Sequence, residues 1–179
     1  MQAVEREEGQ PVLWKLMEIC LLRAGPQQLP AAPQFLTLIL IGYFLVGLLI
    51  SRLSFDLGAA AAVSLLDLLL MAAFAQLALR IVAKPERFTQ TLAALAGTGQ
   101  LLSLLALPLI QRLYAAQAAG DTAAGAAMAW LALLIWSLLV LGHILRHALS
   151  VSLMTGVGVA VLYSLASVMI VRVVFPGSG

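Results

Sequence analysis

The sequence predicts an all-α, polytopic membrane protein, with five transmembrane helices preceded by an N-terminal amphipathic helix at the membrane interface. The first observation behind this prediction is composition: the 179 residues are 63% hydrophobic and only 10% charged, whereas about a quarter of the residues of a soluble domain carry charge. The second is that the chain contains five apolar stretches, each near the roughly 20 residues that cross a bilayer core. The third is that the connections between these stretches are too short to form a soluble domain.

Charge and cysteine content exclude several other classes of protein. The net charge of +2 is small and the basic residues are scattered along the chain, so we expect no nucleic-acid surface. A single cysteine, Cys20, excludes an internal disulfide framework and a cysteine-based metal cluster. The N-terminal stretch MQAVEREEGQ is polar and acidic, and it leads into no short apolar core with a cleavage site. We therefore expect the first spanning helix to act as its own targeting signal.

An amphipathic helix is predicted for residues 11–23, PVLWKLMEICLLR, which are too few to span a bilayer. Lys15 and Glu18 fall on one narrow stripe of this helix, Trp14 suits the depth of the headgroups, and Pro11 fits the first turn. The following stretch, GPQQLPAAP, contains three prolines and predicts an extended connector. The segment is a surface anchor with a stiff elbow or, alternatively, a docking helix for a partner. Its apolar side consists of Val12, Leu13, Leu16, Ile19 and Cys20.

The domain organisation follows from these stretches. Residues 1–33 form a cytoplasmic N-terminal segment, residues 34–173 a bundle of transmembrane helices, and residues 174–179 a C-terminal tail. Short connectors such as SRLSFDLG and QRLYAAQAAGD join the spans. The five spans are placed at residues 34–50, 59–79, 88–110, 124–145 and 149–171.

The distribution of basic residues predicts the orientation of the bundle. With the N-terminus inside, seven basic residues lie on the inner side and three on the outer side. Because basic residues are enriched in cytoplasmic loops, this difference favours an N-in, C-out topology. Trp130 and Tyr114 then lie near the outer interface, where aromatic anchors are common. The inner set is Arg6, Lys15, Arg23, Arg80, Lys84, Arg87 and Arg146, and the outer set is Arg52, Arg112 and Arg172.

Asp67 is the ionisable residue that the sequence places deep in the bilayer. It lies near the middle of the second span, where an Asp costs about 3 kcal/mol on insertion scales. Matching the midpoints of the spans brings Tyr43, Gln100 and Trp136 to a similar depth, so Tyr43 and Gln100 are candidate donors to the carboxyl group. One hypothesis is a proton-coupled or gating carboxylate, because intramembrane acids often have that role. The alternative is a protonated or hydrogen-bonded acid that fixes helix packing.

Small residues at four-residue spacing on the fifth span predict close packing of that helix, with Gly158 beside the ridge that they form. Gly97 and Gly99 in the third span offer an internal match, which we favour over a second protein as the partner of this ridge. Neither stretch has the Lys and Ser/Thr of a phosphate-binding loop. The ridge consists of Ser152, Gly156, Ala160 and Ser164.

Histidines and basic residues near the inner side offer further candidates. His143 and His147 are four residues apart on one helix face, but no third ligand completes a metal site. We therefore expect both side chains to reach the interface as polar anchors, and we expect no metal and no other cofactor. Arg80, Lys84 and Arg87 form the densest basic connector, which fits topology and anionic headgroups or, alternatively, contact with a partner.

The plan of an N-terminal segment followed by five closely spaced spans resembles the Yip-type five-span membrane family. The stretches that carry the resemblance are ALAGTGQLLSLLALPL and VLGHILRHALSVSLMTGVGVAVLYSLASVMIV, and it covers residues 35–173. LLRAGPQQLPAAP, which leads into the first span, is similar to the same part of small proteobacterial inner-membrane proteins. The resemblance implies an integral protein of the bacterial inner membrane. The Tyr-Gly element of the eukaryotic family's cytosolic segment is absent, so no functional residue is carried over.

The sequence predicts a protein that is not an enzyme, because it lacks a nucleophile with a base, or paired carboxylates, at helical spacing. The expected function is that of a scaffold or accessory subunit of a membrane protein complex, acting through helix packing and the N-terminal helix. Its partners are then the lipid bilayer and a second membrane protein or copies of itself. The alternative is a small oligomeric transporter or channel in which Asp67 binds a proton or cation. A membrane enzyme that uses His143 or His147 is the third interpretation.

Overall fold

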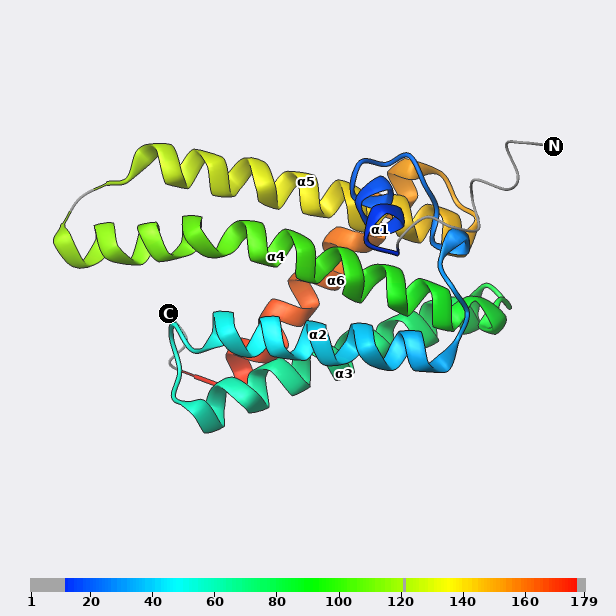
Figure 1. Ribbon diagram of the computed structural model, residues 1–179, viewed down its shortest axis with the longest axis horizontal. Helices are drawn as coiled ribbons and strands as arrows, with labels where there is room; N and C mark the ends of the chain where they lie inside the picture. The colour runs from blue at the N-terminus through cyan, green and yellow to red at the C-terminus, as the bar shows by residue number, and fades with distance from the viewer. Residues whose placement is uncertain (1–11, 121, 177–179) are drawn as a thin grey trace.

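The computed structural model describes residues 12–120 and 122–176. This part of the chain contains six α-helices and two short 3₁₀ helices, η1 and η2 (Figure 1). Five of the described helices, α2 to α6, are long and apolar enough to cross a membrane, so the predicted all-helical class and number of spans are confirmed. Predictions on Arg6, Pro11 and residues 177–179 lie outside the described residues. The elements are α1 (Val12–Cys20), η1 (Pro26–Gln28), α2 (Pro33–Ser51), α3 (Leu57–Ile81), η2 (Pro85–Arg87), α4 (Phe88–Ala119), α5 (Ala124–Leu149) and α6 (Leu153–Val174).

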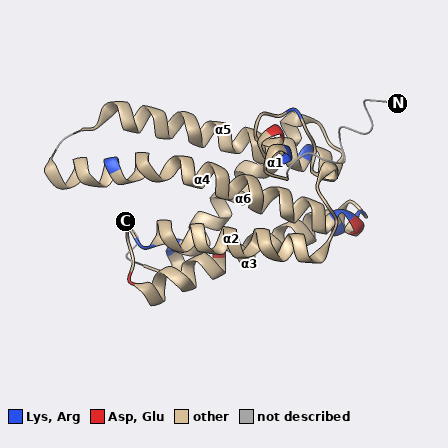
Figure 2. Cartoon of the chain, viewed as in Figure 1, with Lys and Arg blue, Asp and Glu red and all other residues tan. Residues whose placement is uncertain are grey.

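The spans run antiparallel and give the bundle two ends (Figure 1). We call one the basic end: it contains α1, η1, η2 and the α5–α6 turn. The other, the far end, contains the α2–α3 and α4–α5 turns and the last turn of α6. Figure 2 shows that the basic residues gather toward these two ends. The described basic residues toward the basic end are Lys15, Arg23, Arg80, Lys84, Arg87 and Arg146, and those toward the far end are Arg52, Arg112 and Arg172.

Helix α4 is longer than the sequence predicted. The expected connector after residue 110 is helical through Ala119, because QRLYAAQAA consists largely of good helix formers. Gly120, in the left-handed conformation at φ 71°, ends the helix. The 32 residues of α4 correspond to about 48 Å, and Pro108 lies within them. The α4–α5 hairpin therefore extends past the α2–α3 turn at the far end (Figure 1).

The α5–α6 turn is tied to the connector that precedes α4. Arg87 Nη1 donates to the carbonyls of His147, at 3.0 Å, and Ala148, at 3.1 Å. Lys84 Nζ donates to the carbonyl of Leu149 at 3.4 Å. These carbonyls belong to the last turn of α5, where the helix itself offers no donor. The basic connector thus caps α5 within the same chain.

Buried residues of the two central helices lie mainly in their basic-end halves. On α4 they run from Thr91 to Thr98, with Leu102 beyond. On α5 they lie between Val140 and Leu149, apart from Ala126. Helix α2 has no buried residue. The bundle is therefore packed tightly near the basic end and more loosely toward the far end.

Helix α1 packs against α4 and α5 with one face and leaves an apolar face exposed. Leu16 and Ile19 are fully buried. Gly97 of α4 makes room for Leu16, since a Cβ atom at that glycine would lie 2.6 Å from Leu16 Cδ2. Trp14 is 50% exposed, so it lies on a different face of the predicted interfacial helix from Leu16 and Ile19. The exposed apolar side chains of this segment are Leu13, Trp14, Met17 and Leu21.

Side chains of α4 and α5 bind backbone carbonyls of the N-terminal segment. Gln90 Nε2 donates to the carbonyl of Leu29 at 2.8 Å. His143 Nε2 lies 3.0 Å from the carbonyl oxygen of Ala24, and the His143 side chain is buried. The expectation that His143 reaches the interface is therefore wrong, because the N-terminal segment covers it and supplies its hydrogen-bond partner.

Glycines bring α5 and α6 into close contact near the basic end. A Cβ atom at Gly142 would lie 2.8 Å from both the N and the Cα atoms of Val157. A Cβ atom at Gly156 would lie 3.0 Å from the backbone N of Arg146. Ala160, further along α6, is fully buried. Gly156 and Ala160 of the predicted ridge therefore pack against α5, whereas Ser152 is the exposed N-cap residue that precedes α6.

The expected pairing of this ridge with the glycines of α4 is wrong. A Cβ atom at Gly99 would lie 3.1 Å from Tyr43 Cε2, so this glycine faces α2, while Gly97 faces Leu16 of α1. The physical reason is the short connection between α5 and α6, which makes these consecutive helices neighbours in space.

Replacing Gly156 by alanine is expected to destabilise the protein by about 1–3 kcal/mol, because the added methyl group must displace backbone atoms of α5. The matched control is Gly158→Ala on the same helix, where a Cβ atom meets nothing within 4 Å. That change removes the helix penalty of glycine and is expected to be neutral or mildly stabilising. Unfolding of both variants in mixed SDS micelles measures the difference. Equal stability of the two variants would contradict close packing of α5 on α6.

Candidate functional site

Hydroxyl groups from two helices meet the carboxyl group of Asp67, near the middle of α3. Tyr43 Oη, on α2, donates to Asp67 Oδ2 at 2.5 Å. Ser167 Oγ, on α6, donates to Asp67 Oδ1 at 3.3 Å. Hydrogen bonds between transmembrane helices contribute roughly 0.6–2 kcal/mol each. One carboxyl group thereby joins three of the spans.

Two glycines at the contact between α2 and α4 make room for the polar side chains. Gly99 allows the ring of Tyr43 to lie against the backbone of α4. Gly42 leaves space for the amide of Gln100, because a Cβ atom there would lie 2.5 Å from Gln100 Oε1. Small residues thus lie where the site needs space as well as where α6 packs against α5.

Two cavities meet at Asp67. The larger, of 480 Å³, lies where α3 and α4 face α5 and α6, and we call it the α5/α6 cleft. The smaller, of 170 Å³, lies between α2 and α4, and we call it the middle cavity. Tyr43, Asp67 and Ser103 line both, and Gln100 lines the middle cavity. The other polar residues that line the α5/α6 cleft are Thr98, Ser137, Tyr163, Ser164 and Ser167.

The site contains oxygen atoms but no positive charge. No Lys, Arg or His is among the residues that line the two cavities, and Figure 2 shows the basic residues toward the two ends. In residues 12–120 and 122–176, no group of three His, Cys, Asp or Glu could hold a metal ion. An ionised carboxylate in such surroundings requires a cation. Carboxylate and hydroxyl oxygens suit a proton or a small, hard cation.

The structure brings together three of the four residues that depth matching placed at one level. Tyr43, Asp67 and Gln100 share the middle cavity, and Tyr43 is the predicted donor that bonds to Asp67. Trp136 instead points to the N-terminal segment, where its Nε1 donates to the carbonyl of Cys20 at 3.1 Å.

Sequence reasoning missed the contribution of α6 to the site. Tyr163 and Ser167 are four residues apart, so they project from the same face of that helix. Both line the α5/α6 cleft, and the Tyr163 ring stacks on Phe74 of α3 with centroids 4.4 Å apart. The sequence signal that could have predicted this contribution is the pair of polar residues at four-residue spacing on an otherwise apolar span. Ser103 on α4 was missed because a single serine in a leucine-rich run does not show which side of the helix faces the site.

No protein-family model, no curated protein and no solved structure matches the chain. The resemblance to the Yip-type five-span family therefore stays a prediction. The chemistry of the site is argued from its own residues.

The thiol of Cys20 is half-buried at the end of α1, and this burial raises its pKa to about 11. Because the thiolate is the reactive form, we expect the rate of alkylation by iodoacetamide to rise about tenfold per pH unit up to about pH 11. An ordinary thiol, with a pKa of about 8.5, levels off near pH 9. Initial labelling rates of the folded protein at several pH values measure this, and the SDS-unfolded chain is the control. A plateau near pH 9 in the folded protein would show that the thiol is not buried.

Proposed function

We propose that the protein is a small, non-enzymatic membrane transporter or channel in which Asp67 binds a proton or a small cation. The observation that supports this most directly is the position of Asp67 in the walls of both the α5/α6 cleft and the middle cavity. A group that borders two cavities is within reach of water and small ions inside the bundle, which suits a site that binds and releases an ion. Acids inside membrane spans are costly and commonly mark such paths.

The partners of Asp67 support a cation or proton rather than an anion as the ligand. Tyr43 and Ser167 offer oxygen atoms beside the carboxyl group, and the lining residues include no basic side chain that would bind an anion. Five spans leave little room for a complete pathway inside one bundle. We therefore propose that the protein acts as an oligomer.

An N-in, C-out orientation in the inner (cytoplasmic) membrane is part of this proposal. Among the described residues, six basic side chains lie toward the basic end and three toward the far end. Since cytoplasmic loops are enriched in basic residues, this difference supports a basic end that faces the cytoplasm. The far end then faces outward.

Replacing Asp67 by asparagine is expected to abolish flux, because the amide keeps the shape of the side chain but cannot bind a proton or balance a cation. The measurement is pH-dependent ion flux into liposomes that contain the purified protein. Tyr43→Phe removes one hydrogen bond to the carboxyl group and is expected to lower the rate by about tenfold, since such bonds are worth about 1.5 kcal/mol.

The matched control for this flux measurement is Glu86→Gln, which removes one carboxylate from an exposed position at the basic end. We expect it to leave the flux unchanged. An Asp67→Asn protein that folds and conducts ions like the wild-type protein would contradict the proposal.

A second candidate function is that of a scaffold or accessory subunit of a membrane protein complex. The specific observation in its favour is the apolar outer face of α1, where Leu13, Trp14 and Met17 are each at least half exposed. Leu16 and Ile19 hold this helix to the bundle from its other side. A fixed helix with an unpaired apolar face suits contact with lipid or with a partner.

Gentle solubilisation of the tagged chain from its native membrane, followed by mass measurement, tests the second candidate. A stoichiometric partner is expected to be retained and then lost on Leu13→Ser with Met17→Ser, because these changes make the outer face of α1 polar. Ala31→Ser, at an exposed position of the connector that precedes α2, is the comparison variant. A chain that is always recovered alone, or only with copies of itself, would rule against an accessory role.

A further inference from the structure

Cavities follow one another from the far end of the bundle to Asp67. One cavity, of 520 Å³, lies at the far end between the end of α2 and the last turns of α4, and we call it the far-end cavity. Ile50 lines both the far-end cavity and the middle cavity. The middle cavity in turn contains Asp67. A single side chain, Ile50, therefore marks the boundary between the far-end cavity and the cavity that reaches Asp67.

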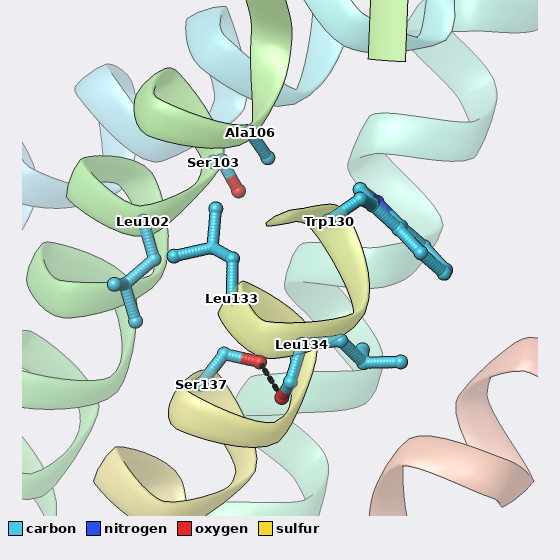
Figure 3. Close-up of a pocket in the computed structure, with 7 residues that line it drawn as sticks. All are labelled: Leu102, Ser103, Ala106, Trp130, Leu133, Leu134 and Ser137. Atoms are coloured by element: carbon cyan, nitrogen blue, oxygen red, sulfur yellow. Dashed lines mark hydrogen bonds between the residues drawn. The ribbon is translucent and has the colours of Figure 1, made fainter. Parts of the chain in front are cut away.

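A smaller side cavity, of 110 Å³, has lining residues in common with the far-end cavity and with the α5/α6 cleft. It shares Trp130 with the far-end cavity, and it shares Ser103 and Ser137 with the cleft. Figure 3 shows Ser103 from α4 and Leu133 from α5 close together, with the ring of Trp130 directed away from them. Ser103 lines the side cavity, the middle cavity and the cleft.

Polar side chains accompany these cavities along their length. Tyr114 Oη and Ser54 Oγ are hydrogen-bonded at 2.6 Å in the wall of the far-end cavity, which Gln117 also lines. Gln100 and Ser103 follow in the middle cavity, next to Asp67. Hydroxyl and amide groups at these positions can replace part of the hydration of water molecules or of a small cation.

The side of Asp67 that faces the basic end is densely packed between α4 and α5. The stretch of α4 from Thr91 to Thr98 and the residues of α5 between Val140 and Leu149 are mostly buried there. Helix α1 adds Leu16 and Ile19 to the same core, both fully buried. A core of this density has no space for a continuous column of water.

We propose that water and small cations reach Asp67 from the far end only, through a half-channel whose narrowest point is at Ile50. The identity of the ligand that uses this path depends on the function proposed above, whereas the geometry of the path does not. The half-channel gives Asp67 one-sided access, so delivery to the basic end requires a second conformation in which the contacts of α4 and α5 there open.

Cysteine labelling of the full chain in lipid vesicles tests the half-channel. Ser103→Cys, in a Cys20→Ser background, places a thiol at the meeting point of three cavities. A membrane-impermeant, cationic methanethiosulfonate is added to one side of the bilayer at a time. We expect modification from the far-end side on the order of tenfold faster than that of Leu105→Cys, an outward-facing neighbour that is 62% exposed on the bundle surface, because only hydrated thiolates react. We expect none from the basic-end side.

Two markers and two further variants complete the experiment. Ala118→Cys at the far end and Glu86→Cys at the basic end report which side of the protein faces the reagent. Ile50→Trp is expected to slow the modification of Ser103→Cys, and Ile50→Ala to speed it, because the first narrows the boundary and the second widens it. A cysteine at position 103 that reacts no faster than one at position 105, or equally from both sides, would overturn the half-channel.

The flux measurement tests the proposed function and the labelling experiment tests the half-channel, and either proposal can fail without the other. Labelling from the far end without any ion flux would keep the half-channel and reject the transport function. Flux that depends on Asp67 in a protein whose position 103 is unreactive would keep the function and reject this path.

Discussion

The close contact of α5 with α6 at Gly142 and Gly156 is the constraint on which the rest of the bundle depends. Two backbones that approach so closely at the basic end leave α6 free to depart from α5 toward the far end, where Phe175 meets Phe55 with ring centroids 6.3 Å apart. The divergence opens the α5/α6 cleft, and it also carries Ser167 to Asp67 on α3. The close contact of α5 with α6 therefore accounts both for the tight packing at the basic end and for the α5/α6 cleft.

Closure of the basic end is completed by bonds to backbone rather than to side chains. Gln90, Trp136 and His143 bind carbonyls of the N-terminal segment, and Arg87 binds carbonyls at the end of α5. Backbone acceptors are present whatever the side chain, so these contacts depend little on the sequence of the covered segment. The buried polar groups of this end are thereby satisfied, as a site within or near lipid requires.

The sequence predicts well what depends on local composition and less well what depends on packing. Apolar length identified five spans, and matching their midpoints was enough to pair Tyr43 with Asp67. Helix α4 was predicted too short because the span was taken to end with its apolar run, whereas the good helix formers of QRLYAAQAA continue the helix beyond that run. The partner of the α6 ridge was misjudged because small residues show that a neighbour is close but not which neighbour it is. His143 could not be recognised as buried, since the segment that covers it lies about 120 positions earlier in the chain.

Pro108 divides α4 between its densely packed first half and the hairpin at the far end. It has no N–H to donate to the carbonyl of Leu104, and its ring crowds the preceding turn. The helix bends there more cheaply than at positions where the hydrogen-bond ladder is intact. Pro108 thus separates two segments of α4. The first segment is packed into the core near the basic end, and the second carries Tyr114 and Gln117. Pro108 lies between Ser103, which lines the middle cavity, and Tyr114, which lines the far-end cavity, so a bend there would shift one cavity relative to the other.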